Sequence, residues 1–303
     1  MRGSWRRLSL LALVVALVAC NESGDSGYRP VYARTAPVSG RVLEFGIHPL
    51  HNPETLFQVY QPLVDYLNAR LGGPVLKLEA SRSYAAFDAR LVDRQFAIAL
   101  PNSYEITLAQ DHGYHSFAKF DDDREFRGII LVRRDSGIKQ VSDLKGKAVS
   151  YPAPTALAAT MLPQAFLVEH GIDLRRDIEN IYVGSQESSI LSVYLGKVAA
   201  GATWPPPWIK FQRDDPAKAA QLEVKWDTRS LPHNGFVARD DVPPELVARL
   251  TGLLTALDRT DEGRALLARV PVARIVPTVD QAYQPTRDFI RWFSATIRKP
   301  EEP

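Results

Sequence analysis

The sequence has little cysteine, no excess of charge of one sign and no extreme content of glycine or proline. A single cysteine among 303 residues excludes a disulfide scaffold, and 18 glycines with 22 prolines exclude a collagen-like or disordered chain. A formal net charge of +2 is not the basic excess that marks a nucleic-acid partner. The hydrophobic content of 45% is typical of a globular chain with one large or two medium domains.

The first twenty residues predict the signal peptide of a lipoprotein. Three arginines precede an apolar run, Leu8–Ala19, which is too short to span a bilayer comfortably. Residues 17–20 read LVAC, which resembles the bacterial lipobox, and the only cysteine, Cys20, stands where the lipid is attached. We therefore expect cleavage after residue 19 and lipid attachment at Cys20. The alternative is an ordinary core cysteine after an ordinary signal peptide.

The mature chain that follows is expected to face the periplasm on a lipid anchor. Of the 37 basic residues three lie in 1–19, which leaves 34 against 35 acidic residues, a net charge of about −1. With no thiol beyond Cys20, the core alone must hold the body together. Residues 20–40 are rich in Gly, Ser and Pro and predict a flexible tether. Asn21 leaves both the inner and the outer membrane open as the site of the anchor.

The rest of the chain alternates short apolar runs with helical patterns, which predicts an α/β fold. Residues 42–47 and 75–80 are expected to be strands on either side of a helix over 53–71, and residues 156–170 form a later helix. We expect two lobes that each contain one mixed sheet flanked by helices, with a ligand in the cleft between them. Lobe one is predicted over 41–130 and 234–303, lobe two over 131–233, and the crossings that form the hinge near 128–134 and 227–236.

Five short motifs in the body resemble one known family. Residues 60–67 read YQPLVDYL, 83–87 SYAAF, 101–104 PNSY, 132–138 VRRDSGI and 143–147 DLKGK. In this order and spacing, the chain is similar to the phosphonate/phosphite-type periplasmic substrate-binding proteins of ABC importers over nearly all of residues 41–270. The resemblance implies a type II-like periplasmic-binding-protein fold that closes on a small-molecule ligand and is not an enzyme. It also implies a membrane permease and ATPase, or other envelope transport proteins, as partners.

The turn that binds the oxyanion in this family differs here. Phosphonate binders use a Ser-Thr-Ser-Gly turn at a helix N-terminus, where hydroxyls and backbone donors face the negative charge. Residues 156–159 of this chain read ALAA, so Leu157 and three alanines replace the hydroxyls, and only Thr155 and Thr160 flank them.

Other pocket positions of the family have also lost polarity. Tyr84 matches the family's first tyrosine, but Phe126 stands where the second is expected. The carboxylates that contact an aminophosphonate fall at Pro206 and Asn234. Because burying a phosphonate without donors costs several kcal/mol, we expect an apolar or weakly polar ligand, such as a lipid or sterol.

The remaining candidates are aromatic or polar residues near the predicted cleft. Trp204 and Trp208 flank three prolines, which predict a rigid loop that either forms a wall of the cleft or packs its own surface. Glu187, beside Gln186, either accepts a hydrogen bond from the ligand or caps a helix. His48 and His51 are weak evidence for a metal and better candidates for polar contacts. In all, the expected ligand-binding residues are His48, Tyr84, Asn102, Tyr104, Phe126, Thr155, Leu157, Glu187, Trp204, Trp208 and Asn234, with no metal and no cofactor.

Two other functions stay open at this point. One is an ABC-importer binding protein for a phosphonate- or phosphite-type oxyanion that uses Thr155, Tyr84 and backbone amides. The other is a subunit that senses a ligand for a membrane kinase. An enzyme has little support, because the sequence contains no nucleophile elbow, P-loop or dinucleotide fingerprint.

Overall fold

A computed structural model describes residues 42–270 and 272–302. Gly40–Pro303 form one compact unit that contains two sheets. The predicted signal peptide, the lipid-attachment residue Cys20 and the tether lie outside the described residues.

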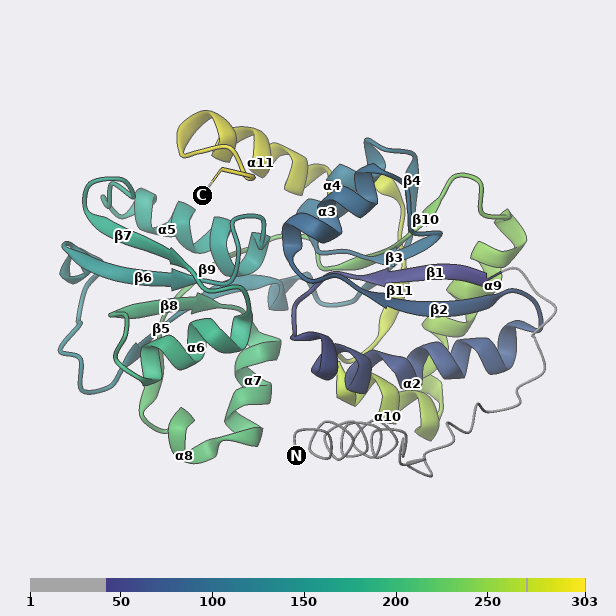
Figure 1. Cartoon of the computed structure of the whole chain (residues 1–303), viewed down its shortest axis with the longest axis horizontal. Helices are drawn as coiled ribbons and strands as arrows, with labels where there is room; N and C mark the ends of the chain where they lie inside the picture. Colours follow the sequence, from purple (N-terminus) through teal and green to yellow (C-terminus); the bar gives the residue numbers. More distant parts are fainter. Residues whose placement is uncertain (1–41, 271, 303) are drawn as a thin grey trace, which may run out of the picture. The chain divides into compact units, whose positions relative to one another are not determined.

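The first sheet has six strands in the order β11-β4-β10-β3-β1-β2 (Figure 1). One half of the sheet, β3-β1-β2, is parallel, because β1 pairs in parallel with both β2 and β3, whereas β10 runs antiparallel to β3 and β4. The strands are β1 (Val42–Ile47), β2 (Val75–Ala80), β3 (Ile98–Leu100), β4 (Tyr114–Phe120), β10 (Gly235–Arg239) and β11 (Ile275–Pro277).

The second sheet has five strands in the order β7-β6-β8-β5-β9. β6 pairs in parallel with β7 and β8, and β5 pairs antiparallel with β8 and β9. Both sheets are therefore mixed and flanked by helices, as the sequence predicted. The strands are β5 (Arg127–Arg133), β6 (Lys147–Tyr151), β7 (Ile178–Tyr182), β8 (Ala200–Thr203) and β9 (Leu222–Ser230).

Helices cover both faces of each sheet. In β5, Ile130 and Val132 pack with helix α5, whereas Ile129 and Leu131 pack with α6 and α7 on the opposite face, as the two-residue period of a strand requires. In the first sheet, Ile98 and Leu100 belong to the core beside α2 and α9, and Ala99 belongs to the core beside α3 and α4. The helices are α2 (Pro53–Leu71), α3 (Tyr84–Val92), α4 (Ser103–Gln110), α5 (Leu162–Glu169), α6 (Gln186–Tyr194), α7 (Pro205–Asp214), α8 (Pro216–Ala219), α9 (Pro244–Thr255), α10 (Asp261–Arg269) and α11 (Gln284–Thr296).

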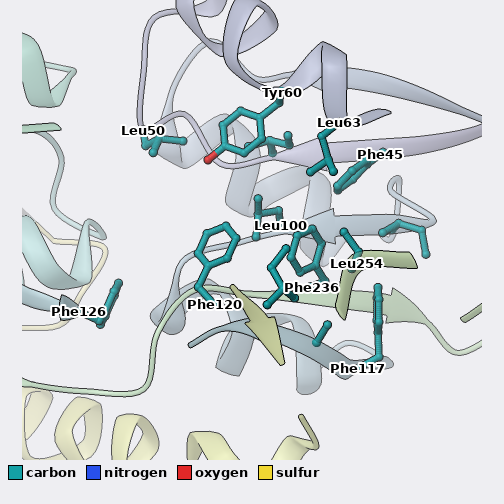
Figure 2. Close-up of a cluster of buried hydrophobic side chains, with 14 of the residues drawn as sticks. Phe45, Leu50, Tyr60, Leu63, Leu100, Phe117, Phe120, Phe126, Phe236 and Leu254 are labelled. Atoms are coloured by element: carbon teal, nitrogen blue, oxygen red, sulfur yellow. The ribbon is translucent and has the colours of Figure 1, made fainter. Parts of the chain in front are cut away.

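A cluster of aromatic side chains fills the core of the first sheet (Figure 2). Phe236 on β10 lies at its centre, with ring centroids 6.2 Å from Phe45, 6.1 Å from Phe117 and 5.8 Å from Phe120. Such tilted and edge-on pairs add to the free energy of burial. The cluster packs side chains of β1 and β10 against those of β4, the strand after which the chain leaves the first sheet.

The chain passes between the sheets along two main connections. Residues 121–126 join β4 to β5, and residues 231–234 join β9 to β10. These crossings are close to the predicted ones, but β5 pairs only with strands of the second sheet from Arg127 onward. A further contact follows α11, where Arg298 donates hydrogen bonds to the Pro154 carbonyl at 2.9 Å and to Gln164 Oε1 at 2.9 Å. The lobe bounds predicted above stay a prediction.

The segment WPPPW is a helix rather than the predicted rigid loop. Trp204 is the N-cap of α7, and Pro205, Pro206 and Pro207 occupy its first turn. Proline is tolerated there because the first N–H groups of a helix have no partner within the helix. The predicted helix over 156–170 also differs locally, since residues Leu157–Met161 form a π-helical turn before α5.

We predict that Phe236→Ala destabilises the first sheet strongly. Phe236 is fully buried, so its truncation leaves a cavity and lowers the free energy of unfolding by about 3–5 kcal/mol. Phe57→Ala is the matched control, because Phe57 is 40% exposed and its loss changes stability by about 0.5 kcal/mol or less. Urea unfolding followed by circular dichroism measures both; equal losses in the two variants would contradict the assigned core.

Candidate functional site

A small cavity of about 210 Å³ lies where strand ends of both sheets meet, and we call it the inner cavity. In open α/β sheets ligands bind beyond the carboxyl ends of the strands. Here His48 follows β1, Asn102 follows β3 and Trp204 follows β8. The cavity is lined by His48, Tyr84, Asn102, Phe126, Ala156, Leu157, Ala158, Ala159, Gln186, Trp204 and Asn234.

His48 presents a hydrogen-bond acceptor to the inner cavity. Its Nδ1 lies 2.9 Å from the Leu100 carbonyl oxygen, which only accepts, so Nδ1 holds the proton. Burial lowers the pKa of His48 to about 4, so the ring is neutral near pH 7. Nε2 therefore has no proton and no partner among the described residues, and it is free to accept a hydrogen bond from a ligand.

Gln186 and Tyr84 form a pair of donors that bridges the two sheets. Gln186 Oε1 accepts from Thr203 Oγ1 at 2.8 Å, which fixes the orientation of the amide. Its Nε2 donates to the Tyr84 hydroxyl at 3.5 Å, which leaves the Tyr84 proton available to another acceptor. Burial raises the pKa of Tyr84 far above its ordinary value, so the hydroxyl stays a donor.

The turn at residues 156–159 supplies backbone donors. Thr160 and Met161 are the first residues of this helix whose N–H groups bond to a preceding carbonyl, that of Ala156. The N–H groups of Leu157, Ala158 and Ala159 have no partner in the part of the chain that the structure describes, as is typical of a first helical turn. All three residues are buried and line the inner cavity, so these N–H groups need an acceptor from elsewhere.

An aromatic wall closes another side of the inner cavity. The Phe126 ring lies 5.7 Å from that of Trp204, and both pack edge-on or tilted against His233. Burial lowers the pKa of His233 to about 3, so this ring is neutral as well. Asn234 Nδ2 has no partner among the described residues, and its Oδ1 is buried without a hydrogen bond.

Three further hydrogen bonds join the two sheets around the cavity. Thr155 Oγ1 donates to Asp88 Oδ2 at 3.1 Å, and the Thr155 carbonyl accepts from Asn102 Nδ2 at 3.4 Å. His51 Nδ1 lies 2.6 Å from Glu187 Oε1. Burial raises the pKa of Glu187, but the hydrogen bond and charge of His51 outweigh this effect and hold that pKa below its ordinary value. These contacts hold the two sheets together beside the cavity.

The structure brings seven of the predicted ligand-binding residues together at the inner cavity and places four elsewhere. Thr155 and Glu187 form the contacts between the sheets just described. The Tyr104 hydroxyl donates to Glu301, and Trp208 stacks on Phe211 in the core beside α7. Whether any of the eleven binds a ligand stays a prediction. The seven that line the cavity are His48, Tyr84, Asn102, Phe126, Leu157, Trp204 and Asn234.

The residue that sequence reasoning assigned least well is Gln186. Glu187 was the expected ligand contact, but Ser185 caps α6 by accepting from the Ser188 N–H, and the phase of the helix turns Gln186 into the cavity and Glu187 toward His51. Burial of polar side chains would have indicated the difference, because Gln186 is 2% exposed. No group of three or more His, Cys, Asp or Glu side chains suited to a metal is found in residues 42–270 and 272–302.

The fold and the site define a two-lobed binding protein, and comparison with known proteins gives its family. A family model described as "ABC transporter, phosphonate, periplasmic substrate-binding protein" matches residues 45–283. The chain therefore belongs to the family of phosphonate periplasmic substrate-binding proteins of ABC transporters. The resemblance noted in the sequence is confirmed, and members of this family bind substrates for transport rather than act as enzymes.

Individual relatives are distant but cover most of the chain. The phosphate-import protein PhnD of Mycolicibacterium smegmatis is 24% identical over 255 residues, which are 79% of this chain and 79% of that protein. A probable ABC transporter phosphite-binding protein, PhnD1, of Prochlorococcus marinus is 24% identical over 191 residues, 60% of this chain and 59% of that protein. A structure of Prochlorococcus marinus PhnD1 in complex with methylphosphonate has a TM-score of 0.77 at 18% identity and covers 84% of this chain and 98% of its own, which shows the shared fold.

The family also indicates that the protein works in the periplasm. A periplasmic binding protein of an ABC importer binds a small ligand and works with a membrane permease and ATPase. Within the described ranges, none of the helices has the length and hydropathy that a membrane span requires.

We predict that the two buried histidines make the fold sensitive to mild acid. Below the ordinary histidine pKa of 6.5 the unfolded chain takes up protons that the folded chain does not, until the pH reaches about 4. Each histidine therefore makes the free energy of unfolding decrease as the pH falls in this window, by up to about 1.4 kcal/mol per pH unit. Asp88 and Glu105 act in the opposite direction, because burial raises the pKa of Asp88 to about 7 and that of Glu105 above its ordinary value. Urea unfolding between pH 7 and pH 4.5 measures the slope. His48→Gln removes one histidine's contribution, so its stability should fall less, or rise more, on acidification than that of the wild type, whereas exposed His170→Gln should follow the wild type. The same slope in wild type and His48→Gln would contradict the assignment.

Proposed function

We propose that the inner cavity binds a small oxyanion of the phosphonate, phosphite or phosphate type and that the protein delivers it to an ABC permease. The observation on which this depends is that the N–H groups of Leu157, Ala158 and Ala159 have no partner among the described residues and belong to a turn that lines the inner cavity. A helix N-terminus is a favourable site for an anion, because the N–H groups and the helix dipole both stabilise negative charge.

The loss of hydroxyls from this turn does not remove its affinity for an anion. Backbone N–H groups are present whatever the side chain, so Leu157 and the alanines beside it keep the donors that a Ser-Thr-Ser-Gly turn would also offer. The hydroxyl of Tyr84 and the amides of Gln186 and Asn102 supply side-chain donors. These groups support the oxyanion that the sequence analysis left as an alternative.

A lipid or sterol, the ligand that the sequence first favoured, is not supported. The volume of about 210 Å³ includes space open to solvent, and the enclosed part of the inner cavity has room only for water-sized groups, so a lipid does not fit in it. A lipid would also bury the three N–H groups without an acceptor, at a cost of about 1–3 kcal/mol each. The family and the relatives described above agree with a small polar ligand.

The acceptor at His48 favours an oxyanion that still holds a proton. Nε2 of the neutral ring accepts a hydrogen bond, and an anion without a proton would place a lone pair against it. Among the residues that the structure describes, no lysine or arginine lines the inner cavity, so a fully deprotonated anion finds no compensating charge from them. A hydrogen phosphonate, phosphite or phosphate has both the oxygens for the N–H groups and the P–OH for His48.

We also propose that the mature protein is a lipoprotein anchored through Cys20. The support is the LVAC motif and the tether-like composition of residues 20–40. Labelling with radioactive palmitate, compared between the wild type and Cys20→Ala, tests the anchor independently of the ligand.

We predict that Leu157→Pro weakens oxyanion binding more than Leu157→Ala does. Proline removes the N–H but suits the first position of a helix, and Ala156 before it has ψ of 90°, outside the helical region that proline disfavours. Leu157→Ala is the control, because it truncates the same side chain and keeps the N–H. A hydrogen bond to a charged group contributes about 1.5–3 kcal/mol, so titration calorimetry with methylphosphonate should give at least roughly tenfold weaker binding for the proline variant. Equal affinities would contradict the role of the backbone.

We predict that the protein distinguishes methylphosphonate from methanesulfonate. Both are tetrahedral anions with one methyl group, but near neutral pH only methylphosphonate keeps a proton for His48 Nε2. Calorimetry at pH 6.5 should therefore give an affinity for methylphosphonate at least about tenfold higher, since mismatching one buried acceptor costs 1–3 kcal/mol. Tighter binding of methanesulfonate would rule out the protonated ligand.

A further inference from the structure

Two buried carboxyl groups, those of Asp88 and Glu105, lie together beside the inner cavity. Asp88 is on α3 and Glu105 on α4, and these two helices pack against each other (Figure 1). The two side chains are within hydrogen-bonding distance of one another. Asp88 Oδ1 and Glu105 Oε1 are buried and receive no hydrogen bond from any other described residue. Two buried carboxyl groups this close do not both ionise, and a single proton between these two oxygens satisfies both.

The other oxygen of each carboxyl group holds Thr155, the residue before the turn at 156–159. Asp88 Oδ2 accepts from Thr155 Oγ1 at 3.1 Å. Glu105 Oε2 accepts from the Asn102 N–H at 2.7 Å, and Asn102 Nδ2 donates to the Thr155 carbonyl at 3.4 Å. The hydroxyl and the carbonyl of Thr155 are therefore both bound by the carboxyl pair, one directly and the other through Asn102. Because residues 156–159 line the inner cavity, the pair fixes the start of the turn that carries the free N–H groups.

The groups around the pair favour retention of the proton. Burial is the largest cause that raises the pKa of Asp88, to about 7, and that of Glu105 above its ordinary value. The charge nearest to Asp88 from another element is that of Glu301, which is negative and accepts from the Tyr104 hydroxyl. Burial also raises the pKa of Tyr84 and Tyr104, so both stay neutral. Within residues 42–270 and 272–302, no cation contributes to the pKa of either carboxyl group.

We propose that Asp88 and Glu105 share one proton and are positioning residues, which hold the anion-binding turn through Thr155 when the two sheets close on a ligand. The enclosed part of the inner cavity has room only for water-sized groups, so the sheets move apart to admit an oxyanion. Separation takes Thr155 away from Asp88 and admits water, which favours the charged carboxylate. Closing therefore takes up a proton from solution, and bound ligand and bound proton stabilise each other. This coupling rests on the oxyanion function proposed above, whereas the shared proton does not.

The pH dependence of stability tests the shared proton without a ligand. The folded pair keeps a proton that the unfolded carboxyl groups release, so the folding constant should fall by up to about tenfold per pH unit as the pH rises above 7. Asp88→Asn still accepts from Thr155 and donates to Glu105 but does not titrate, so its slope should be shallower. Asp93→Asn, exposed at the end of the same helix, should follow the wild type. Urea unfolding between pH 7 and pH 8.5 measures the slopes, and equal slopes in wild type and Asp88→Asn would overturn the proposal.

Titration calorimetry with methylphosphonate, in buffers of different ionisation enthalpy, tests the coupling. At pH 7.5 the wild type should take up more protons on binding than Asp88→Asn, by up to about one, because the ligand's own proton contributes equally to both. Thr155→Val keeps the shape of the side chain but removes the hydroxyl, and it should weaken binding at least about tenfold, whereas Thr155→Ser should restore it.

Equal proton uptake in wild type and Asp88→Asn, or wild-type affinity in Thr155→Val, would overturn the coupling. Binding of methylphosphonate to none of these proteins would instead overturn the proposed function, and the stability series without ligand would still decide whether the proton is shared. The two proposals therefore fail separately.

Discussion

The structure depends on one constraint, which is that the first turn of a helix, at Leu157–Ala159, is buried between two sheets with its N–H groups unpaired. Buried backbone donors need acceptors, and a first helical turn has none of its own. Gln186 and His48 line the same cavity as this turn. The amide of Gln186 is oriented by its hydrogen bond with Thr203, and the ring of His48 is neutral. The side chains of the turn are apolar, but the chemistry of the site comes from its backbone.

Closure of the two sheets is what makes these donors effective. The bonds of Thr155 to Asp88 and of His51 to Glu187 join the two sheets beside the cavity and bring the donors of both sheets together. Trp204 forms part of the aromatic wall on one side of this cavity.

Much of this could be predicted from the sequence, and the failures have physical reasons. Helix α2 and strands β1 and β2 follow clear apolar periods, and their predicted bounds are confirmed. Helix α7 was missed because three prolines indicate a loop unless they stand in a first turn. At the site, motif positions gave seven of the lining residues, but the choice between Gln186 and Glu187 depends on the phase of α6, which spacing alone does not determine. The ligand class was judged from side chains, whereas the free donors belong to the backbone.

The most direct test of the account follows the amide groups of the turn themselves. In ¹⁵N-labelled protein, addition of methylphosphonate should move the amide proton resonances of Leu157, Ala158 and Ala159 downfield, as expected when N–H groups gain a charged acceptor. Amides that do not line the inner cavity, such as that of Ile209 on α7, should move far less. Saturation binding that leaves the three resonances unmoved would contradict the account, and so would the absence of any binding.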